Sequence, residues 1–339
     1  MKISHSIVFF IFLLKPILIF PQQQYAKLGD FLLESGEIVY DCKISYRTFG
    51  KLNSDSSNAI LFPTWFGGTS EMLKNLISNG EDKLLDSTQY FIIAVDALGN
   101  GVSTSPSNSL KQLNEKFPRF NIRDIVNSQY ELVKRILGLK KLHAAIGGSM
   151  GGMQVLQLAV SYPDFVKKVV AYVPTPWSSS YDKLLWSTRE QLILSAKKCE
   201  MSEREIFKLI NMLTQLVART PDWFVTNNPA EKFDEYLKTF DKAAPSHWTS
   251  YDYLYQLNAM INHDISKGFQ NRVDLRNHIK AELFLIIAKN DHILHPSTSL
   301  ELSEIINART LILENDCGHL AVNCEIDFVR EQLKSFLNK

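Results

Sequence analysis

The sequence predicts a doubly wound α/β fold: a mostly parallel sheet with helices on both faces and a helical lid inserted over the carboxyl ends of its strands. Two patterns in the 339-residue chain predict it. Short apolar runs typical of buried strands alternate with amphipathic helical patterns, and about a hundred residues of helical pattern interrupt the alternation once. The core is therefore expected in residues 25–174 and 275–339, and the lid in residues 175–274.

The expected elements follow in chain order. Residues 37–49 alternate apolar and polar side chains, as a half-exposed antiparallel strand should, and are expected to pair with a strand around residues 30–34 at one edge of the sheet. A polar turn follows at residues 53–58. Buried parallel strands are then predicted at residues 59–62, 90–95, 142–146, 169–173, 283–288 and 310–313, and helices at residues 122–137, 150–161, 296–306 and 325–337.

The lid segment is rich in aromatic side chains. In open α/β sheets, ligands bind beyond the carboxyl ends of the strands, and an insertion after residue 173 lies over that place. Most of these aromatic residues are expected to form the lid's own core, and two or three to line a pocket. The aromatic residues of the lid are Trp177, Tyr181, Trp186, Trp223, Phe224, Trp248, Tyr251, Tyr253 and Tyr255.

The composition argues for a small-molecule site. Lys plus Arg (37) almost balances Asp plus Glu (36), so nothing indicates nucleic acid as a partner. His292 and His295 form an H-x-x-H pair, but no further ligand pattern accompanies them. We therefore expect no metal and no other cofactor.

Residues 1–22 differ from the rest of the chain. Lys2 precedes an apolar run at residues 7–20, which Lys15-Pro16 interrupts, and a polar stretch follows. The run is short for a membrane span and typical of a signal peptide, which predicts a secreted or periplasmic protein and no stable membrane span. An N-terminal anchor, or an apolar extension packed on the domain of a cytoplasmic protein, is the alternative.

The four cysteines show no C-x-x-C and no zinc-finger spacing. In an exported protein, Cys317 and Cys324 would bridge across a short loop. Inside a cell they would be small buried hydrophobic residues.

A candidate nucleophile lies between the apolar run at residues 144–146 and the helix that follows. Gly147-x-Ser149-x-Gly151 fits G-x-S-x-G, in which a serine occupies a strained strand-to-helix turn and glycines keep side chains from colliding. The alternative is that Ser149 only caps the helix.

A serine nucleophile needs a base, and the base needs an acid that orients it. In this architecture the acid follows a late strand and the histidine follows the last one, which selects Asp291 and His319. Asp316 and Asp96 are alternatives for the acid, because they also end strand-like segments. The alternative for His319 is a surface histidine after a turn glycine.

The negative charge that develops on the substrate needs two backbone donors. One is expected to be the N–H of Met150, directly after the nucleophile. The other is expected in the loop at residues 63–69, from Trp65 or Phe66.

A family resemblance emerges from these residues. Residues 147–154, Gly-Gly-Ser-Met-Gly-Gly-Met-Gln, resemble the nucleophile elbow of homoserine O-acetyltransferases. Residues 58–69, 117–124 and 251–264, and Asp291 with Gly318-His319, resemble the same family in the same order. The resemblance spans the chain from about residue 25 to the C-terminus.

The resemblance implies an α/β-hydrolase fold, a triad of Ser149, Asp291 and His319, and a ping-pong acyl-enzyme mechanism without metal or prosthetic group. Arg189 aligns with the arginine that holds the substrate's carboxylate in the family; the alternative is a salt bridge within the lid. The resemblance also implies homodimers that associate through the lid helices.

Two departures concern the substrate. The family has His-Ala-Leu-Thr-Gly where this chain has the bulkier Thr-Trp-Phe-Gly-Gly at residues 64–68, and it has an aspartate that contacts homoserine where this chain has Leu320. Loss of a charge-assisted partner costs about 1.5–3 kcal/mol. We therefore expect hydrolysis of a small acyl substrate, an ester or amide. The alternatives are acyl transfer from acetyl-CoA to homoserine and, in another class, a non-catalytic binding protein.

Overall fold

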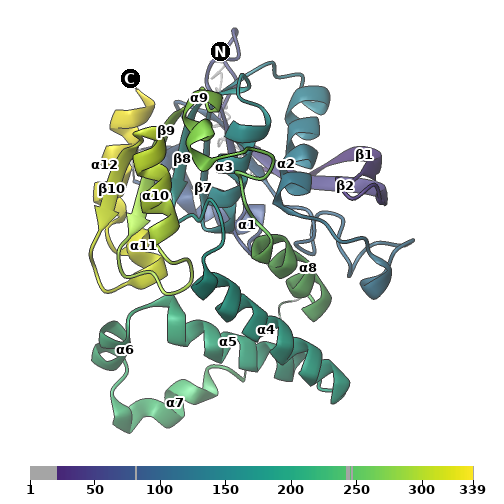
Figure 1. The fold of residues 1–339 in the computed structure, drawn as a ribbon, viewed down its shortest axis with the longest axis vertical. Helices are drawn as coiled ribbons and strands as arrows, with labels where there is room; N and C mark the ends of the chain where they lie inside the picture. The colour runs from purple at the N-terminus through teal and green to yellow at the C-terminus, as the bar shows by residue number, and fades with distance from the viewer. Residues whose placement is uncertain (1–20, 81, 242–244, 246, 339) are drawn as a thin grey trace, which may run out of the picture.

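The computed structural model describes residues 21–80, 82–241, 245 and 247–338 (Figure 1). The apolar leader predicted at residues 1–22 lies almost wholly outside the described residues. Within them, no helix is long and apolar enough to cross a membrane.

The described residues contain one large mixed sheet with the strand order β1-β2-β6-β3-β7-β8-β9-β10. Strands β1 and β2 pair antiparallel, as do β2 and β6, and all pairs from β6 to β10 are parallel. The strands are β1 (Gln24–Leu32), β2 (Ile38–Phe49), β3 (Ala59–Pro63), β6 (Phe91–Val95), β7 (Leu142–Gly148), β8 (Val166–Tyr172), β9 (Glu282–Ala288) and β10 (Arg309–Leu313); β4 (Ile77–Ser78) and β5 (Leu85–Asp86) form a separate small pair. The doubly wound α/β fold predicted from the sequence is confirmed.

The edge strand differs from its prediction. Strand β1 begins at Gln24 and ends at Leu32, whereas the sequence placed it around residues 30–34. Residues 33–36 form the turn into β2: the Leu33 N–H donates to the Glu37 carbonyl, and Gly36 has a φ of +87°. The left-handed backbone conformation favours glycine, and Gly36 adopts it to close the turn, so the strand ends earlier than predicted.

The remaining predicted helices are confirmed with small changes at their ends. The segment predicted at residues 122–137 is an α-helix only as far as Glu131 and continues as one π-helical turn, Leu132–Ile136. The helices outside the insertion are α1 (Ser70–Leu73), α2 (Ile122–Glu131), α3 (Met150–Ser161), α9 (Leu275–His278), α10 (Ser297–Ile306), α11 (Ala321–Cys324) and α12 (Ile326–Leu337).

Both faces of the sheet are covered. Alternate strand residues such as Leu61 and Ala145 pack with α2, α3 and α10, while their neighbours Ile60 and Ala144 pack with α1 and α12 on the other face. A parallel sheet buried on both faces explains why these strands read as continuous apolar runs.

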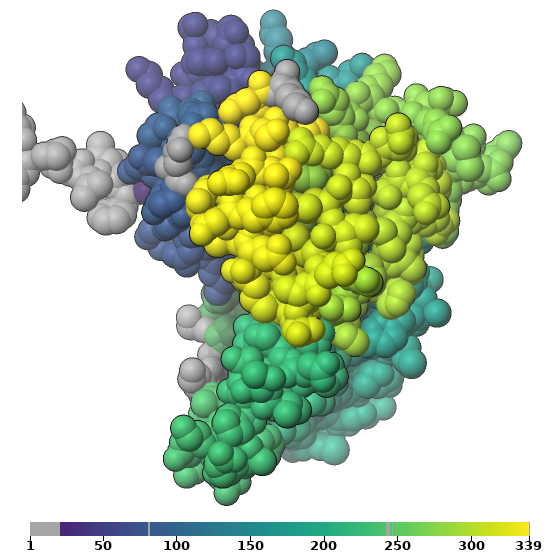
Figure 2. All heavy atoms as spheres, turned by 90° about the vertical axis from the view of Figure 1, so that its left-hand side faces the viewer, coloured from purple at the N-terminus to yellow at the C-terminus, as the bar shows by residue number. Residues whose placement is uncertain are grey.

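The segment between β8 and β9 is helical, as predicted. Its helices are α4 (Ser180–Lys198), α5 (Glu203–Ala218), α6 (Pro221–Asn227), α7 (Phe233–Lys238) and α8 (Ser250–Ile261). Capping boxes begin the three longest, with Ser179, Ser202 and Thr249 at the N-caps. Figure 1 shows α4 to α7 projecting from the sheet at the bottom of the view, and Figure 2 shows the same protrusion from the side, below the C-terminal residues. That residues 175–274 form a separate unit stays a prediction.

The structure contains a disulfide between Cys317 and Cys324, with Cα atoms 6.6 Å apart. Cys42 and Cys199 are free. Of the two alternatives for the first pair, bridge or buried thiols, the structure has the bridge.

Candidate active site

Ser149 occupies the turn between β7 and α3. Its φ is +54° and its ψ −124°, and its N–H donates to the carbonyl of Tyr172 on the neighbouring strand β8, at 3.0 Å. A serine in this region of backbone space is strained, and such strain is typical of functional turns. The Ser149 side chain makes no capping hydrogen bond to α3, so the alternative that it is only a helix cap is wrong.

The glycines around Ser149 are required by close packing. A Cβ on Gly148 would lie 1.9 Å from the Tyr172 ring, and a Cβ on Gly147 would lie 2.3 Å from the carbonyl oxygen of Gly151. The strand therefore reaches the helix without side chains between them, and Ser149 is left to point away from the sheet.

Ser149, His319 and Asp291 are joined by hydrogen bonds. His319 Nε2 lies 2.9 Å from Ser149 Oγ, and His319 Nδ1 lies 2.6 Å from Asp291 Oδ2. A carboxylate only accepts hydrogen bonds, so the imidazole proton is assigned to Nδ1, and Nε2 is left to accept from the serine hydroxyl. This is the arrangement that lets an imidazole take a proton from a serine.

Asp291 is held in place by the backbone that follows it. Its Oδ1 accepts from the N–H groups of Ile293 and Leu294, at 2.8 and 3.0 Å, and the residue is buried. Of the three acids considered, Asp291 makes the hydrogen bond to His319 Nδ1, whereas the Asp96 carboxylate accepts from Ser45 and Ser70.

The two segments expected to supply backbone donors are tied together. Gln154 on α3 donates through Nε2 to the carbonyl oxygens of both Thr64 and Met150, each at 2.9 Å. Met150 is the first residue of α3, where a helix leaves its N–H groups free of intrahelical partners. Within the described part of the chain, the N–H groups of Trp65 and Phe66 donate to no protein acceptor. That these groups act on substrate stays a prediction.

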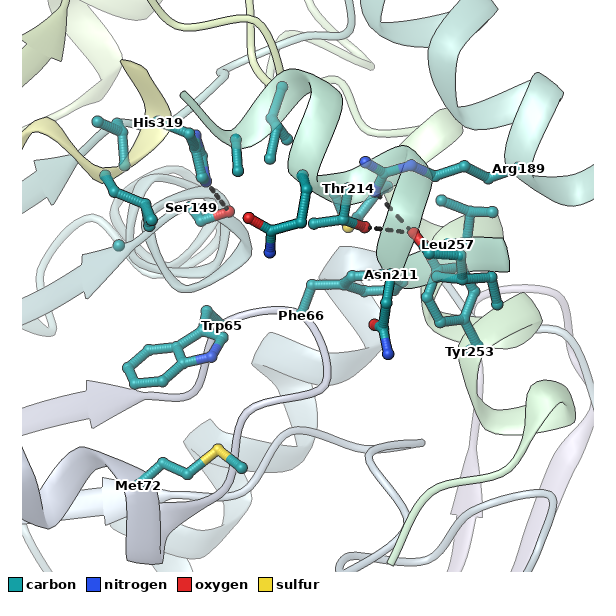
Figure 3. A pocket seen from close by; sticks show the side chains of 18 of the residues that line it. Trp65, Phe66, Met72, Ser149, Arg189, Asn211, Thr214, Tyr253, Leu257 and His319 are labelled. Atoms are coloured by element: carbon teal, nitrogen blue, oxygen red, sulfur yellow. Dashed lines mark hydrogen bonds between the residues drawn. The ribbon is translucent and has the colours of Figure 1, made fainter. Parts of the chain in front are cut away.

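A pocket of about 660 Å³ opens at Ser149 and His319. Figure 3 shows these two residues on one side of it and Arg189 and Tyr253 on the other. Its walls come from the loop at residues 64–69, from α4, α5 and α8 of the insertion, and from the turn after β10. Most lining side chains are apolar or aromatic, and no Asp or Glu is among the described residues that line it.

Arg189 on α4 is 4% exposed. Its Nη1 lies 3.4 Å from the hydroxyl of Tyr253, and its Nε and Nη2 are buried without a hydrogen-bond partner. No carboxylate in the described residues lies within ion-pair distance of it, so the alternative of a lid salt bridge is wrong. A buried guanidinium without a counter-charge is costly, and this one lines the pocket.

Leu320 lies beside His319 on the turn Gly318–Leu320 and also lines the pocket. The disulfide closes the loop that carries both residues.

Three of the lid's nine aromatic residues named from the sequence line the pocket, as expected: Trp186, Trp248 and Tyr253. Sequence reasoning missed Tyr172 and the α5 side chains Asn211 and Thr214. The amphipathic pattern of α5 indicates a packed helix, but a local pattern carries no signal of which polar residues face a distant loop.

Comparison with known proteins agrees with this architecture. The family model described as the alpha/beta hydrolase fold matches residues 59–192. The ethyl acetate hydrolase of Pseudomonas veronii is 40% identical over 158 residues, which is 46% of this chain and 45% of that protein, so the match spans less than half of that relative.

Longer matches point to one branch of this fold. The homoserine O-acetyltransferase of Sulfurimonas autotrophica is 26% identical over 364 residues, covering 90% of this chain and 95% of that protein. The acetyl esterase MekB superposes with a TM-score of 0.85 at 25% identity, covering 94% of this chain and 97% of that one. The chain therefore has the α/β-hydrolase fold and is similar over nearly its whole length to homoserine O-acetyltransferases, whose elbow motif it shares.

Proposed function

We propose that the protein is a serine hydrolase that cleaves a small ester or amide through an acyl-Ser149 intermediate. The observation that carries the proposal is the hydrogen-bonded series Ser149, His319 and Asp291 at the edge of a pocket whose described walls contain no acidic side chain. The hydrogen-bonded residues support nucleophilic catalysis, and the lack of acidic side chains in the described walls supports water as the acceptor.

In the first half of the reaction, Ser149 Oγ attacks the substrate carbonyl carbon while its proton passes to His319 Nε2. The carbonyl oxygen becomes an oxyanion, which would accept from Met150 N–H and from Trp65 or Phe66 N–H. His319 then gives its proton to the leaving alcohol or amine, and the acyl group stays on Ser149. Asp291 stabilises the imidazolium that forms between these two transfers.

In the second half, water takes the place of the alcohol. His319 removes a proton from the water as its oxygen attacks the acyl carbon, and the same proton returns to Ser149 Oγ when the carboxylic acid leaves. Each oxyanion donor is worth roughly 10²- to 10³-fold in kcat, which adds to the contribution of the three side chains.

The acceptor side of the pocket supports hydrolysis over transfer to an amino acid. An amino-acid acceptor brings an ammonium group, and Leu320 offers it no counter-charge. The same holds for every other described lining residue. An uncompensated charge is costly in an apolar pocket, whereas water needs no such partner.

Arg189 supports a substrate that carries a carboxylate or a similar anion. The residue lines the pocket, and its Nε and Nη2, the pair that binds a carboxylate in bidentate fashion, have no partner among the described residues. This same feature favours a second candidate, acetyl transfer from acetyl-CoA to homoserine, because homoserine also carries a carboxylate. Release of free CoA that depends on homoserine would establish that candidate, and its absence would exclude it.

Export and dimerisation are part of the proposal. The disulfide supports a secreted or periplasmic location, since disulfides persist in oxidising compartments; a cytoplasmic protein is the alternative. Exposed apolar residues on the lid helices, among them Leu216 and Val225, support association through the lid. N-terminal sequencing of the secreted protein and light scattering after gel filtration test the two points.

The proposed chemistry is tested by intact-mass analysis after treatment with a fluorophosphonate. The wild type is expected to gain one adduct, and Ser149→Ala none. An adduct that survives Ser149→Ala would refute the assignment of the nucleophile. Turnover of p-nitrophenyl acetate that is equal in wild type and His319→Ala would favour a binding protein on a hydrolase scaffold.

A further inference from the structure

The loop at residues 64–69 is held by the lid as well as by the core. Gln256 on α8 is 0% exposed, and its Oε1 accepts from the N–H of Gly67 at 3.1 Å. Its Nε2 donates to the carbonyl of Leu98, also at 3.1 Å. One buried amide therefore fastens two backbone segments of the core to one lid helix.

The same part of the loop packs closely on the lid. Gly67 has a φ of +66°, and a Cβ there would lie 2.4 Å from the Trp248 ring. The Phe66 ring meets Trp248 and Tyr253 edge to face, with centroids 5.1 and 4.6 Å apart. The loop thus packs on the lid through the Phe66 side chain and Gly67, while Gln256 binds its backbone.

The core holds the loop at its two ends. Gln154 binds the Thr64 carbonyl, and Asn100 donates through Nδ2 to the Gly68 carbonyl at 2.9 Å. Between these points lie the N–H groups of Trp65 and Phe66, and the lid bond at Gly67 comes directly after them. The Trp65 N–H shares a peptide plane with the Thr64 carbonyl that Gln154 binds, and the Phe66 N–H shares one with the Trp65 carbonyl, which accepts from Gly68 N–H at 2.9 Å. The hydrogen bond from Gly67 to Gln256 is the contact by which the lid holds this turn of residues 65–68.

We propose that Gln256 is a positioning residue for the oxyanion donors: by holding Gly67 it keeps the turn of residues 65–68, which carries the N–H groups of Trp65 and Phe66, in place above Ser149. The proposal rests on the proposed function, which makes these groups donors to the oxyanion. Gln256 does not line the pocket, so it acts through the loop and has no contact with substrate.

Helix α8 carries further pocket residues on the same side. Tyr253, Leu257 and Met260 line the pocket, and Tyr253 lies three residues before Gln256. Helix α8 thus connects the Arg189 end of the pocket, through Tyr253, with the loop near Ser149, through Gln256. Donors act over a narrow range, about 2.7–3.1 Å from the oxyanion, and a misplacement of about 1 Å costs roughly 10²-fold in rate.

The test compares Gln256→Met with a matched control, Gln157→Met. Gln157 is also a buried helical glutamine, and its Nε2 donates to Ser161 Oγ at 2.9 Å, outside the pocket. The readouts are kcat and KM for p-nitrophenyl acetate, the inhibition constant of a trifluoromethyl ketone, whose adduct on serine carries an oxyanion, and Tm.

For Gln256→Met we expect kcat to fall about 10- to 100-fold with KM within about threefold, and ketone affinity to fall in parallel. Gln157→Met should keep kcat within about twofold of wild type for a similar loss in Tm. Gln256→Asn, whose amide is one methylene too short to join both segments, is expected to behave like Gln256→Met and serves if the methionine variant does not fold.

Equal kcat in wild type and the Gln256 variants would overturn the proposal, as would equal losses in the Gln256 and Gln157 variants. A wild type that turns over no ester and forms no ketone adduct would instead refute the proposed function, and the role of Gln256 with it. A lost kcat with unchanged ketone affinity would show that the loop is not what Gln256 controls.

Discussion

A substitution of Arg189 is expected to lower activity without lowering stability. The guanidinium is buried, contacts Tyr253 through one nitrogen, and leaves Nε and Nη2 without partners. We therefore expect Arg189→Met to remove an uncompensated buried charge and a substrate contact in one step. Replacing buried charge by an apolar side chain of similar volume is often neutral or stabilising.

The magnitude follows from the two unpartnered nitrogens. If each donates to one oxygen of a substrate carboxylate, and each charge-assisted bond is worth about 1.5 kcal/mol, the substitution removes about 3 kcal/mol of binding. That corresponds to roughly a 150-fold loss in kcat/KM for an ester that carries a carboxylate. For a neutral ester of the same alcohol, kcat/KM should stay within about threefold of wild type.

The assay compares the mono-p-nitrophenyl ester of succinic acid with p-nitrophenyl acetate, and thermal unfolding is measured beside it. Arg309→Met is the matched control, because Arg309 also has a buried Nη1 without a partner and stacks on Phe284 outside the pocket. Tm of Arg189→Met is expected to equal or exceed that of wild type. Equal losses with the two esters, or a control that discriminates as strongly, would refute the role of Arg189 as an anion site.

Three further predictions concern other parts of the molecule. Leu320→Asp places a carboxylate beside His319 and should raise acyl transfer to homoserine relative to hydrolysis by roughly tenfold, measured as O-acyl homoserine against free acid by mass spectrometry. Replacing Cys317 and Cys324 by serine opens the loop that carries His319, and should lower kcat roughly 3- to 10-fold and lower Tm. Burial lowers the pKa of His263 to about 3, so its neutral form stabilises the fold above the unfolded pKa near 6.5, and this stabilisation is lost as pH falls toward 3. His263→Phe should therefore lose about 2 kcal/mol less stability than wild type between pH 7 and pH 5, measured by denaturant unfolding.

Each of these has a contrary outcome. An unchanged product ratio in Leu320→Asp would mean that the missing acid does not decide the acceptor. Full activity in the double serine variant would show that other contacts, such as the hydrogen bond from Cys317 N–H to Asn315, hold the loop without the bridge. Parallel pH dependence in wild type and His263→Phe would place the acid-sensitive group elsewhere.

The sequence predicts well the features that depend on a local pattern or on the order of strands and helices along the chain. The elbow is a strand, a turn and a helix within one stretch, so the glycine spacing together with the apolar run before it and the helical pattern after it points to Ser149. Asp291 and His319 each follow a strand whose place in a parallel sheet is fixed by alternation with helices, and parallel strands bring their carboxyl ends to one edge. The three residues lie up to 170 positions apart, yet their convergence follows from topology.

What the sequence does not predict depends on how the lid docks. The bond between Gln256 and Gly67 joins residues 189 positions apart on elements with no shared periodicity. Tyr172 lines the pocket because its ring lies over Gly148, which no strand pattern reveals. That no described carboxylate pairs with Arg189 is equally invisible in the sequence, because it offers several acids near enough in the chain to do so.

The pocket divides into a part that resembles the acetyltransferases and a part that does not. Around Ser149 the elbow, the histidine and the acid have the arrangement that acyl transfer needs, and Arg189, for which we propose an anion-binding role, lies at the other side. The differences gather between these two ends, at Leu320 and at the bulky loop around Phe66, where an acceptor would have to lie. An enzyme whose attack machinery is retained and whose acceptor contacts are replaced by apolar surface still forms the acyl-enzyme, and water is then the nucleophile that loses least by the change.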